Sequence, residues 1–210
     1  MTRVYFIRHA ESDKSVRDGR IRPLTEKGAK DRRLVTEFLQ DKGIDVVISS
    51  PFLRAVETVK DFADKNGYEI SVVENFRERK SDSNMASYSA DFTAFMKKQW
   101  DDFNYTFSDG ECLAEVQRRN IEALNGVLAE HKNRNIVIGT HGTALSTIIN
   151  YYDSSYVFQD FMAMVNILPW VVRMTFEENT CVGIEKIDLF GKAAESRQDL
   201  FSKERRGLGR

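Results

Sequence analysis

Short, almost purely apolar runs that end abruptly in polar residues constrain the fold of this chain more than any other feature. They cover residues 4–8, 46–48 and 136–138. Continuous apolar runs of this length are typical of strands buried on both faces of a sheet. Helical patterns separate them, so the alternation predicts a mostly parallel sheet with helices packed on both faces.

Capping residues mark where the intervening helices begin. Thr25 is predicted to cap a helix that stops near Gly43. Ser50-Pro51 predicts a second N-cap, with proline at the first helical position. Asp109-Gly110-Glu111 is expected to open a long helix, and Gly142-Thr143 a further one.

The remaining strands complete the predicted sheet. Residues 70–73 are expected to form a third strand, and residues 170–176 and 181–189 a hairpin around Glu177-Glu178-Asn179. The predicted fold class is α/β, a three-layer α/β/α arrangement whose mostly parallel central sheet has an antiparallel edge hairpin.

The length of 210 residues fits one domain with a single substantial core. We expect this domain to cover residues 1–190, with a helical or lid insertion at about 79–108, and a polar tail at 191–210. Aromatic residues in the insertion fit either a lid over the site or ordinary core packing.

Composition excludes several classes of partner. A net charge of -1 gives no basic field for nucleic acid or an anionic membrane surface. The two cysteines lie far apart, without zinc-site spacing. No apolar run approaches the roughly 20 residues of a membrane span. We therefore expect a cytoplasmic protein with small-molecule partners, and the sequence does not define its oligomeric state.

Polar side chains follow the predicted parallel strands at the ends where ligands bind in open α/β sheets. Arg8 and His9 follow the first strand, Arg54 the second, Glu78 the third and His141 the fourth. Two of the three histidines in the chain are in this set. Guanidinium forks and helix N-termini both suit phosphate oxygens, so the set predicts a phosphate site.

Six blocks of sequence, taken in order, identify the chain as similar to a known family. They are Arg8-His9-Ala10-Glu11, Pro23-Leu24-Thr25-Glu26-Lys27-Gly28, Ser49-Ser50-Pro51-Phe52-Leu53-Arg54-Ala55-Val56-Glu57-Thr58, Arg77-Glu78-Arg79, Asp109-Gly110-Glu111 and Thr140-His141-Gly142-Thr143. The chain resembles the histidine phosphatase, or phosphoglycerate mutase-like, superfamily over residues 3 to roughly 150.

The resemblance implies a role for each matched residue. His9 would be the nucleophile that becomes phosphohistidine, and Glu78 would be the proton donor. Arg8, Arg54 and His141 would hold the phosphoryl oxygens. The resemblance implies neither a metal nor a cofactor.

Simpler roles for these residues remain alternatives. The histidines could be hydrogen-bonded structural residues, and Arg54 could pair with Glu57 on a surface helix. The acid could be Glu74 or Glu111 instead of Glu78.

Departures from the family pattern bear on specificity. Ala10 stands where the family commonly has glycine, and Ser15 stands where mutases have an asparagine that touches substrate. Ser15, Arg22 and Arg79 are candidate specificity residues.

The function expected from the resemblance is a metal-independent phosphatase that acts on a small phosphomonoester through phosphohistidine. The alternatives are a 2,3-bisphosphoglycerate-dependent phosphoglycerate mutase and, less favoured, a non-catalytic phosphoryl-binding module.

Overall fold

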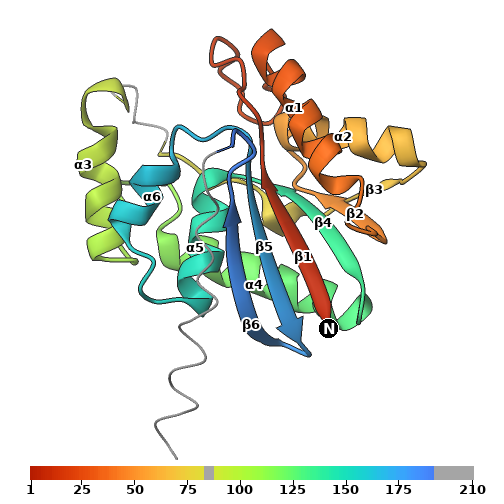
Figure 1. Ribbon diagram of the computed structural model, residues 1–210. Coiled ribbons are helices and arrows are strands. Elements are labelled where there is room, and N and C mark those ends of the chain that lie inside the picture. The colour runs from red at the N-terminus through yellow and green to blue at the C-terminus, as the bar shows by residue number, and fades with distance from the viewer. Residues whose placement is uncertain (83–87, 192–210) are drawn as a thin grey trace, which may run out of the picture.

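The computed structural model describes residues 1–82 and 88–191, and its centre is a six-stranded sheet in the order β3-β2-β4-β1-β5-β6 (Figure 1). The first four strands in the chain are parallel, β5 runs antiparallel to β1, and β6 runs antiparallel to β5. The α/β fold with an antiparallel edge hairpin is confirmed. The strands are β1 (Thr2–Arg8), β2 (Val46–Ser49), β3 (Ile70–Val72), β4 (Asn135–Thr140), β5 (Trp170–Glu177) and β6 (Thr180–Ile187).

Helices cover both faces of the sheet, and Figure 1 shows α1 and α2 on the opposite side from α4 and α5. The elements other than strands are α1 (Glu26–Leu39), α2 (Leu53–Asn66), the 3₁₀ turn η1 (Glu74–Phe76), α3 (Tyr88–Asp101), α4 (Leu113–Glu130), α5 (Gly142–Tyr152) and α6 (Phe158–Met164).

Strand β1 explains why both layers of helices are needed. Its successive side chains point to opposite faces. Val4 and Phe6 pack in the core under α4 and α5, whereas Tyr5 and Ile7 pack in the core under α1 and α2. All four side chains are at most 3% exposed, so the central strand has no solvated face.

Two predicted helix starts are wrong by a few residues. Helix α2 begins at Leu53 rather than at the Ser50-Pro51 pair, and its N-cap is Phe52. The hydroxyl oxygen of Ser50 accepts the N–H of Phe52, which precedes the helix, at 3.2 Å, and the same hydroxyl contacts the ring of His141. The predicted N-cap Thr25 is confirmed, since its side chain accepts from the N–H of Gly28.

The long helix α4 begins at Leu113, beyond the predicted Asp109-Gly110-Glu111 start. The carboxylate of Glu111 binds Arg119 and the N–H of Lys80 instead of capping the helix. Glu115 takes over part of the capping by accepting from the N–H of Cys112 at 3.1 Å.

The insertion at about 79–108 contains α3, and several of its described aromatic residues pack in the core, whereas Phe107 is 62% exposed. Phe95 is 7% exposed, and the ring of Trp100 lies 5.8 Å from that of Phe161 on α6. For these two side chains, core packing is the better description of the two alternatives. Residues 83–87 of the insertion, and the predicted tail beyond Gly191, lie outside the described residues.

In the part of the chain that the structure describes, no helix is long and apolar enough to cross a membrane.

Candidate active site

The two histidines of the predicted site meet where β1 and β4 end. These strands are parallel neighbours, with Arg8 opposite Thr140, and the N–H of His9 donates to the Thr140 carbonyl at 3.0 Å. The residues that follow this pair are His9 and His141. Their ring centroids lie 5.3 Å apart, with the planes inclined by 60°.

The ring of His9 is fixed by its own loop. Nδ1 lies 2.7 Å from the carbonyl oxygen of Ala10, which can only accept a hydrogen bond. Nδ1 therefore has the proton in the neutral ring, and Nε2 has a free lone pair. Burial and the positive charges of Arg54 and Arg8 hold the pKa of His9 well below its usual value. His9 is thus a neutral imidazole, with Nε2 available as a nucleophile or base.

His141 is fully buried, and its ring is held by Ser50. Nε2 lies 2.7 Å from the hydroxyl oxygen of Ser50, which also accepts the N–H of Phe52 at 3.2 Å. Nδ1 has no hydrogen-bond partner among the described residues. Burial and the charge of Arg54 lower the pKa of His141 well below its usual value, so this ring is also neutral.

The direction of the bond between Ser50 and His141 follows from counting donors. The hydroxyl has one proton, and His141 Nε2 is the only acceptor recorded for it among the described residues. A hydroxyl that donates to Nε2 is satisfied, and the ring proton then lies on Nδ1. The sequence analysis missed this contact, although Ser50 lies in the block that contains Arg54.

The guanidinium of Arg8 is fixed by the end of α6. Nη1 donates to the carbonyls of Met164 at 2.6 Å and Ile167 at 3.2 Å, and Nη2 donates to that of Val165 at 3.0 Å. Nε has no partner among the described residues. A Cβ at Gly142 would lie 3.3 Å from this Nε, so glycine permits the close approach of Arg8 to α5.

Arg54 is a buried arginine rather than a member of a surface ion pair. Its Nη1 donates to the carbonyl of Gly19 at 2.6 Å, and its guanidinium lies 4.9 Å from the ring centre of Phe52. Glu57, the alternative partner, instead accepts from the N–H of Leu24. Burial lowers the pKa of Arg54 to about 10, and the same cause lowers that of Arg8 to about 10.

Glu78 lies at the N-terminus of α5. Its Oε1 accepts from the N–H groups of Arg79 at 2.8 Å and Ala144 at 3.2 Å, and its Oε2 accepts from that of Thr143 at 3.3 Å. The start of α5 therefore binds a side-chain carboxylate. The charge of Glu78 also favours the protonated forms of Arg8 and Arg54.

The other two candidate acids have different partners. Glu74 pairs with Arg20 at 2.6 Å, and both side chains are more than half exposed. Burial opposes the ionisation of Glu111, yet its hydrogen bonds to Arg119 and to the Lys80 N–H keep its pKa below the usual value. Both carboxyl groups are occupied in ion pairs.

The three candidate specificity residues have different environments. Arg22 donates from Nε to the carbonyl of Val16 at 2.9 Å, and its charge lowers the pKa of His9. Ser15 is exposed, and its N–H donates to Asp13. Arg79 is 7% exposed and lies 5.1 Å from the ring centre of Phe95. Arg22 therefore acts electrostatically on His9.

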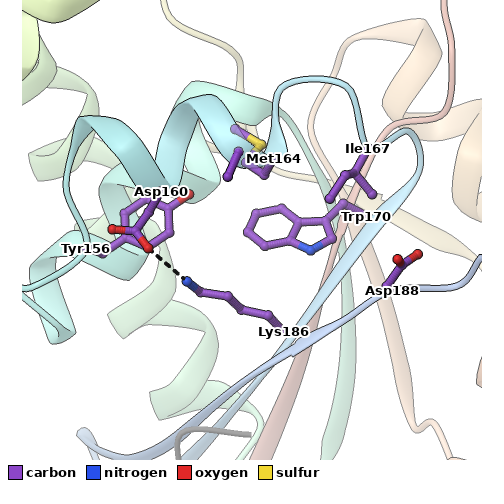
Figure 2. Close-up of a pocket in the computed structure, with 8 residues that line it drawn as sticks. Tyr156, Asp160, Met164, Ile167, Trp170, Lys186 and Asp188 are labelled. Atoms are coloured by element: carbon purple, nitrogen blue, oxygen red, sulfur yellow. Dashed lines mark ion pairs between the residues drawn. The ribbon is translucent and has the colours of Figure 1, made fainter. Parts of the chain in front are cut away.

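A separate cavity of about 210 Å³ lies between α6 and the edge hairpin, where Lys186 pairs with Asp160 (Figure 2). Its lining includes Met164 and Ile167, whose carbonyls bind Arg8. In residues 1–82 and 88–191, no group of three or more His, Cys, Asp and Glu side chains is placed to bind a metal ion.

The fold and the site define an α/β protein with paired histidines and buried arginines at the carboxyl edge of its sheet. Residues 4–166 match the histidine phosphatase superfamily (branch 1), and the chain belongs to this superfamily.

The relatives of this chain include proteins named as phosphatases and proteins named as mutases. A protein named "Probable phosphoglycerate mutase GpmB" from Erwinia tasmaniensis is 28% identical over 159 residues, which are 71% of this chain and 74% of the relative. Phosphoserine phosphatase 1 from Hydrogenobacter thermophilus is 28% identical over 155 residues, covering 67% of this chain and 71% of the relative.

Among solved structures, phosphoserine phosphatase from Entamoeba histolytica in complex with 3-phosphoglyceric acid is similar in fold. It has a TM-score of 0.68 at 20% identity, and the match covers 87% of this chain and 94% of that chain. That structure thus binds a small phosphorylated ligand.

Proposed function

We propose that this chain is a phosphatase that hydrolyses a small phosphomonoester through a phosphohistidine at His9. The observation that supports this most strongly is the state of the His9 ring. The Ala10 carbonyl accepts a hydrogen bond from Nδ1–H, so that Nε2 has a free lone pair beside two buried arginines. A neutral imidazole next to fixed positive charge is the environment that a nucleophile for phosphate esters requires.

In the first step, Nε2 of His9 attacks phosphorus and the bond to the ester oxygen breaks. The leaving oxygen receives its proton from Glu78, which enters this step as the neutral carboxylic acid, and the product alcohol departs. In the second step, water attacks the phosphohistidine and Glu78 takes a proton from that water. The bond between nitrogen and phosphorus breaks, free phosphate leaves, and both His9 and Glu78 return to their starting states.

The phosphoryl oxygens are proposed to bind donors that the protein leaves unused. Among the described residues, these are Nε of Arg8, the guanidinium N–H groups of Arg54 that do not bind Gly19, and Nδ1 of His141. Together they place two positive charges and a neutral donor around the phosphate. The proposed reaction needs no metal, since these groups neutralise the charge that develops.

Glu78 is the preferred acid because of its position rather than its residue type. It contacts the start of α5 directly after His141, and its charge acts on both arginines. Glu74 and Glu111 are bound in ion pairs with Arg20 and Arg119. We therefore propose a small phosphorylated metabolite as substrate, with Arg22 adding attraction for a further anionic group.

A second candidate function is a phosphoglycerate mutase, which returns the phosphoryl group to another oxygen of the substrate. The match to a relative named as such a mutase favours it. The serine at position 15 counts against it. A coupled mutase assay with and without 2,3-bisphosphoglycerate separates the two activities. Retention of the nucleophile, both arginines, the second histidine and an acid disfavours a non-catalytic phosphoryl-binding module.

The test of the proposal is to trap the intermediate. A reaction quenched during turnover should contain an acid-labile, base-stable phosphoramidate on the peptide that contains His9. His9→Ala should lose both the label and turnover, while His131→Gln, at the far end of α4, keeps both. Substrates come from a panel of phosphorylated metabolites assayed with chelator present. A label on the His141 peptide, or turnover by His9→Ala, would contradict the proposal.

A further inference from the structure

The segment that contains Glu78 has little regular structure of its own. After η1 ends at Phe76, residues 77–82 form neither helix nor strand. Backbone carbonyls in such a segment need hydrogen-bond partners from elsewhere when they are shielded from water.

Arg119, from α4, supplies most of these partners. Its Nη1 donates to the carbonyls of Asn75 at 2.7 Å and Arg77 at 2.8 Å, and its Nη2 donates to that of Glu78 at 3.2 Å. Arg119 itself is only 7% exposed. One side chain thus binds three carbonyls within four residues of the chain, and the last of them belongs to Glu78.

Glu111 orients the guanidinium that makes these contacts. Its two oxygens accept from Nε of Arg119 at 2.8 Å and from Nη2 at 2.9 Å, so the pair is bidentate. The same carboxylate accepts from Nη2 of Arg77 at 2.7 Å and from the N–H of Lys80 at 2.8 Å. Glu111 and Arg119 therefore form hydrogen bonds to the chain on both sides of Glu78.

We propose that Arg119, oriented by Glu111, is a positioning residue for the carboxyl group of Glu78. This inference rests on the proposed function, in which Glu78 exchanges protons with the leaving alcohol and with water. Arg119 sets the backbone of Glu78, and the N–H groups of Thr143 and Ala144 set its carboxyl group. Proton transfer depends steeply on such placement, because displacement of a catalytic group by about 1 Å costs as much as about a hundredfold in rate.

The test compares leaving groups. Alkyl phosphates need protonation of the departing oxygen, whereas p-nitrophenyl phosphate needs little. In Arg119→Lys and Arg119→Met, kcat/KM for alkyl phosphates, which reports the steps up to formation of the phosphohistidine, should fall about 10- to 100-fold, while kcat/KM for p-nitrophenyl phosphate changes by less than about threefold. Lysine should not rescue, because it lacks the fork that binds three carbonyls and a carboxylate. Inhibition by vanadate should stay unchanged.

Arg173→Met is the matched control, because Arg173 forms an ion pair with Glu185 on the edge hairpin. It should leave the ratio of alkyl to aryl rates unaltered. Glu111→Gln is the second variant if those at Arg119 do not fold, since it keeps the shape of the side chain and removes its charge. It should shift the same ratio in the same direction. Equal slowing of both substrate classes in the folded variants would overturn the proposal.

Failure of the proposed function gives a different result. Wild-type protein would then turn over neither class of substrate, and no phosphohistidine would form. In that case the carboxyl ¹³C resonance of Glu78 still tests the positioning role without turnover. We expect it to move in Arg119→Lys and not in Arg173→Met, and an unmoved resonance in Arg119→Lys would overturn the proposal.

Discussion

At the scale of single residues, the two histidines are the same tautomer but leave different ring atoms without a protein partner. Nδ1 of His9 is protonated because it faces the Ala10 carbonyl, which leaves Nε2 with a free lone pair. Nδ1 of His141 is protonated because Ser50 donates to its Nε2, which leaves Nδ1–H as a donor. The neighbouring hydrogen bonds, rather than the residue type, therefore determine whether a ring offers a lone pair or an N–H group to a ligand.

We predict that both rings are Nδ1–H tautomers at neutral pH. Long-range ¹H–¹⁵N NMR spectra distinguish the two neutral tautomers, and the chain has only three histidines to assign. Ser50→Ala should shift His141 toward the Nε2–H form and weaken vanadate binding about tenfold, in keeping with the loss of one hydrogen bond to an anion. Ser50→Thr, which keeps the hydroxyl, is the control. An Nε2–H form of His141 in wild-type protein would contradict the prediction.

At the scale of elements, helix α1 begins where its sequence predicts. The hydroxyl oxygen of Thr25 accepts from the N–H of Gly28 at 3.0 Å, and the hydroxyl donates to a carboxylate oxygen of Glu11 at 2.8 Å. Thr25→Ala should lower the free energy of unfolding by about 1 kcal/mol, the usual cost of losing an N-cap. Urea unfolding measures this change, and Thr25→Ser should retain most of the stability. A Thr25→Ala protein as stable as wild type would show that the cap is dispensable.

Strands and their order along the chain could be predicted because a strand that is buried on both faces requires a continuous run of apolar residues. β1, β2 and β4 are apolar runs, and each can be recognised in the sequence without knowing which strands lie beside it. The histidines and arginines of the site could be placed by the rule that parallel strands end at one edge. Their family blocks then supplied the expected roles.

Contacts between distant side chains could not be predicted in this way. The hydroxyl of Ser50 has the right chemistry for an N-cap, and only the fold brings His141 within 2.7 Å of it. In the sequence, nothing distinguishes Arg119 from the other polar residues of a long helix. Its contact with the carbonyl of Glu78 exists only in the folded chain. Helix α6, with seven residues, is too short for a clear apolar period, although its last carbonyls fix Arg8.

At the scale of the whole molecule, burial of neutral histidines makes stability depend on pH. An unfolded histidine binds a proton near its ordinary pKa of 6.5, whereas burial and Arg54 keep the pKa of His141 well below that value in the folded protein. As the pH falls below about 6.5, the unfolded chain therefore binds more protons than the folded one. The free energy of unfolding should fall by about 1.4 kcal/mol per pH unit from this group alone.

Urea unfolding between about pH 7.5 and pH 5.5 measures this slope. His141→Gln should reduce it, while His131→Gln, at the C-terminal end of α4, should leave it close to that of wild type. An identical slope in wild type and His141→Gln would mean that His141 binds its proton equally in both states.

The order of strands in the sheet also determines when the site forms during folding. β1 is the first element of the chain, yet both of its neighbours, β4 and β5, come from the second half. Bringing β1 next to β4 closes a long loop of chain. The entropic cost of that closure opposes folding until the pairing of the two strands stabilises the sheet. During synthesis on the ribosome, Arg8 and His9 thus emerge before β4, and the strands that flank β1 in the sheet are not yet present. Formation of the histidine pair therefore reports folding of the complete sheet, and no amino-terminal fragment that lacks β4 can assemble it.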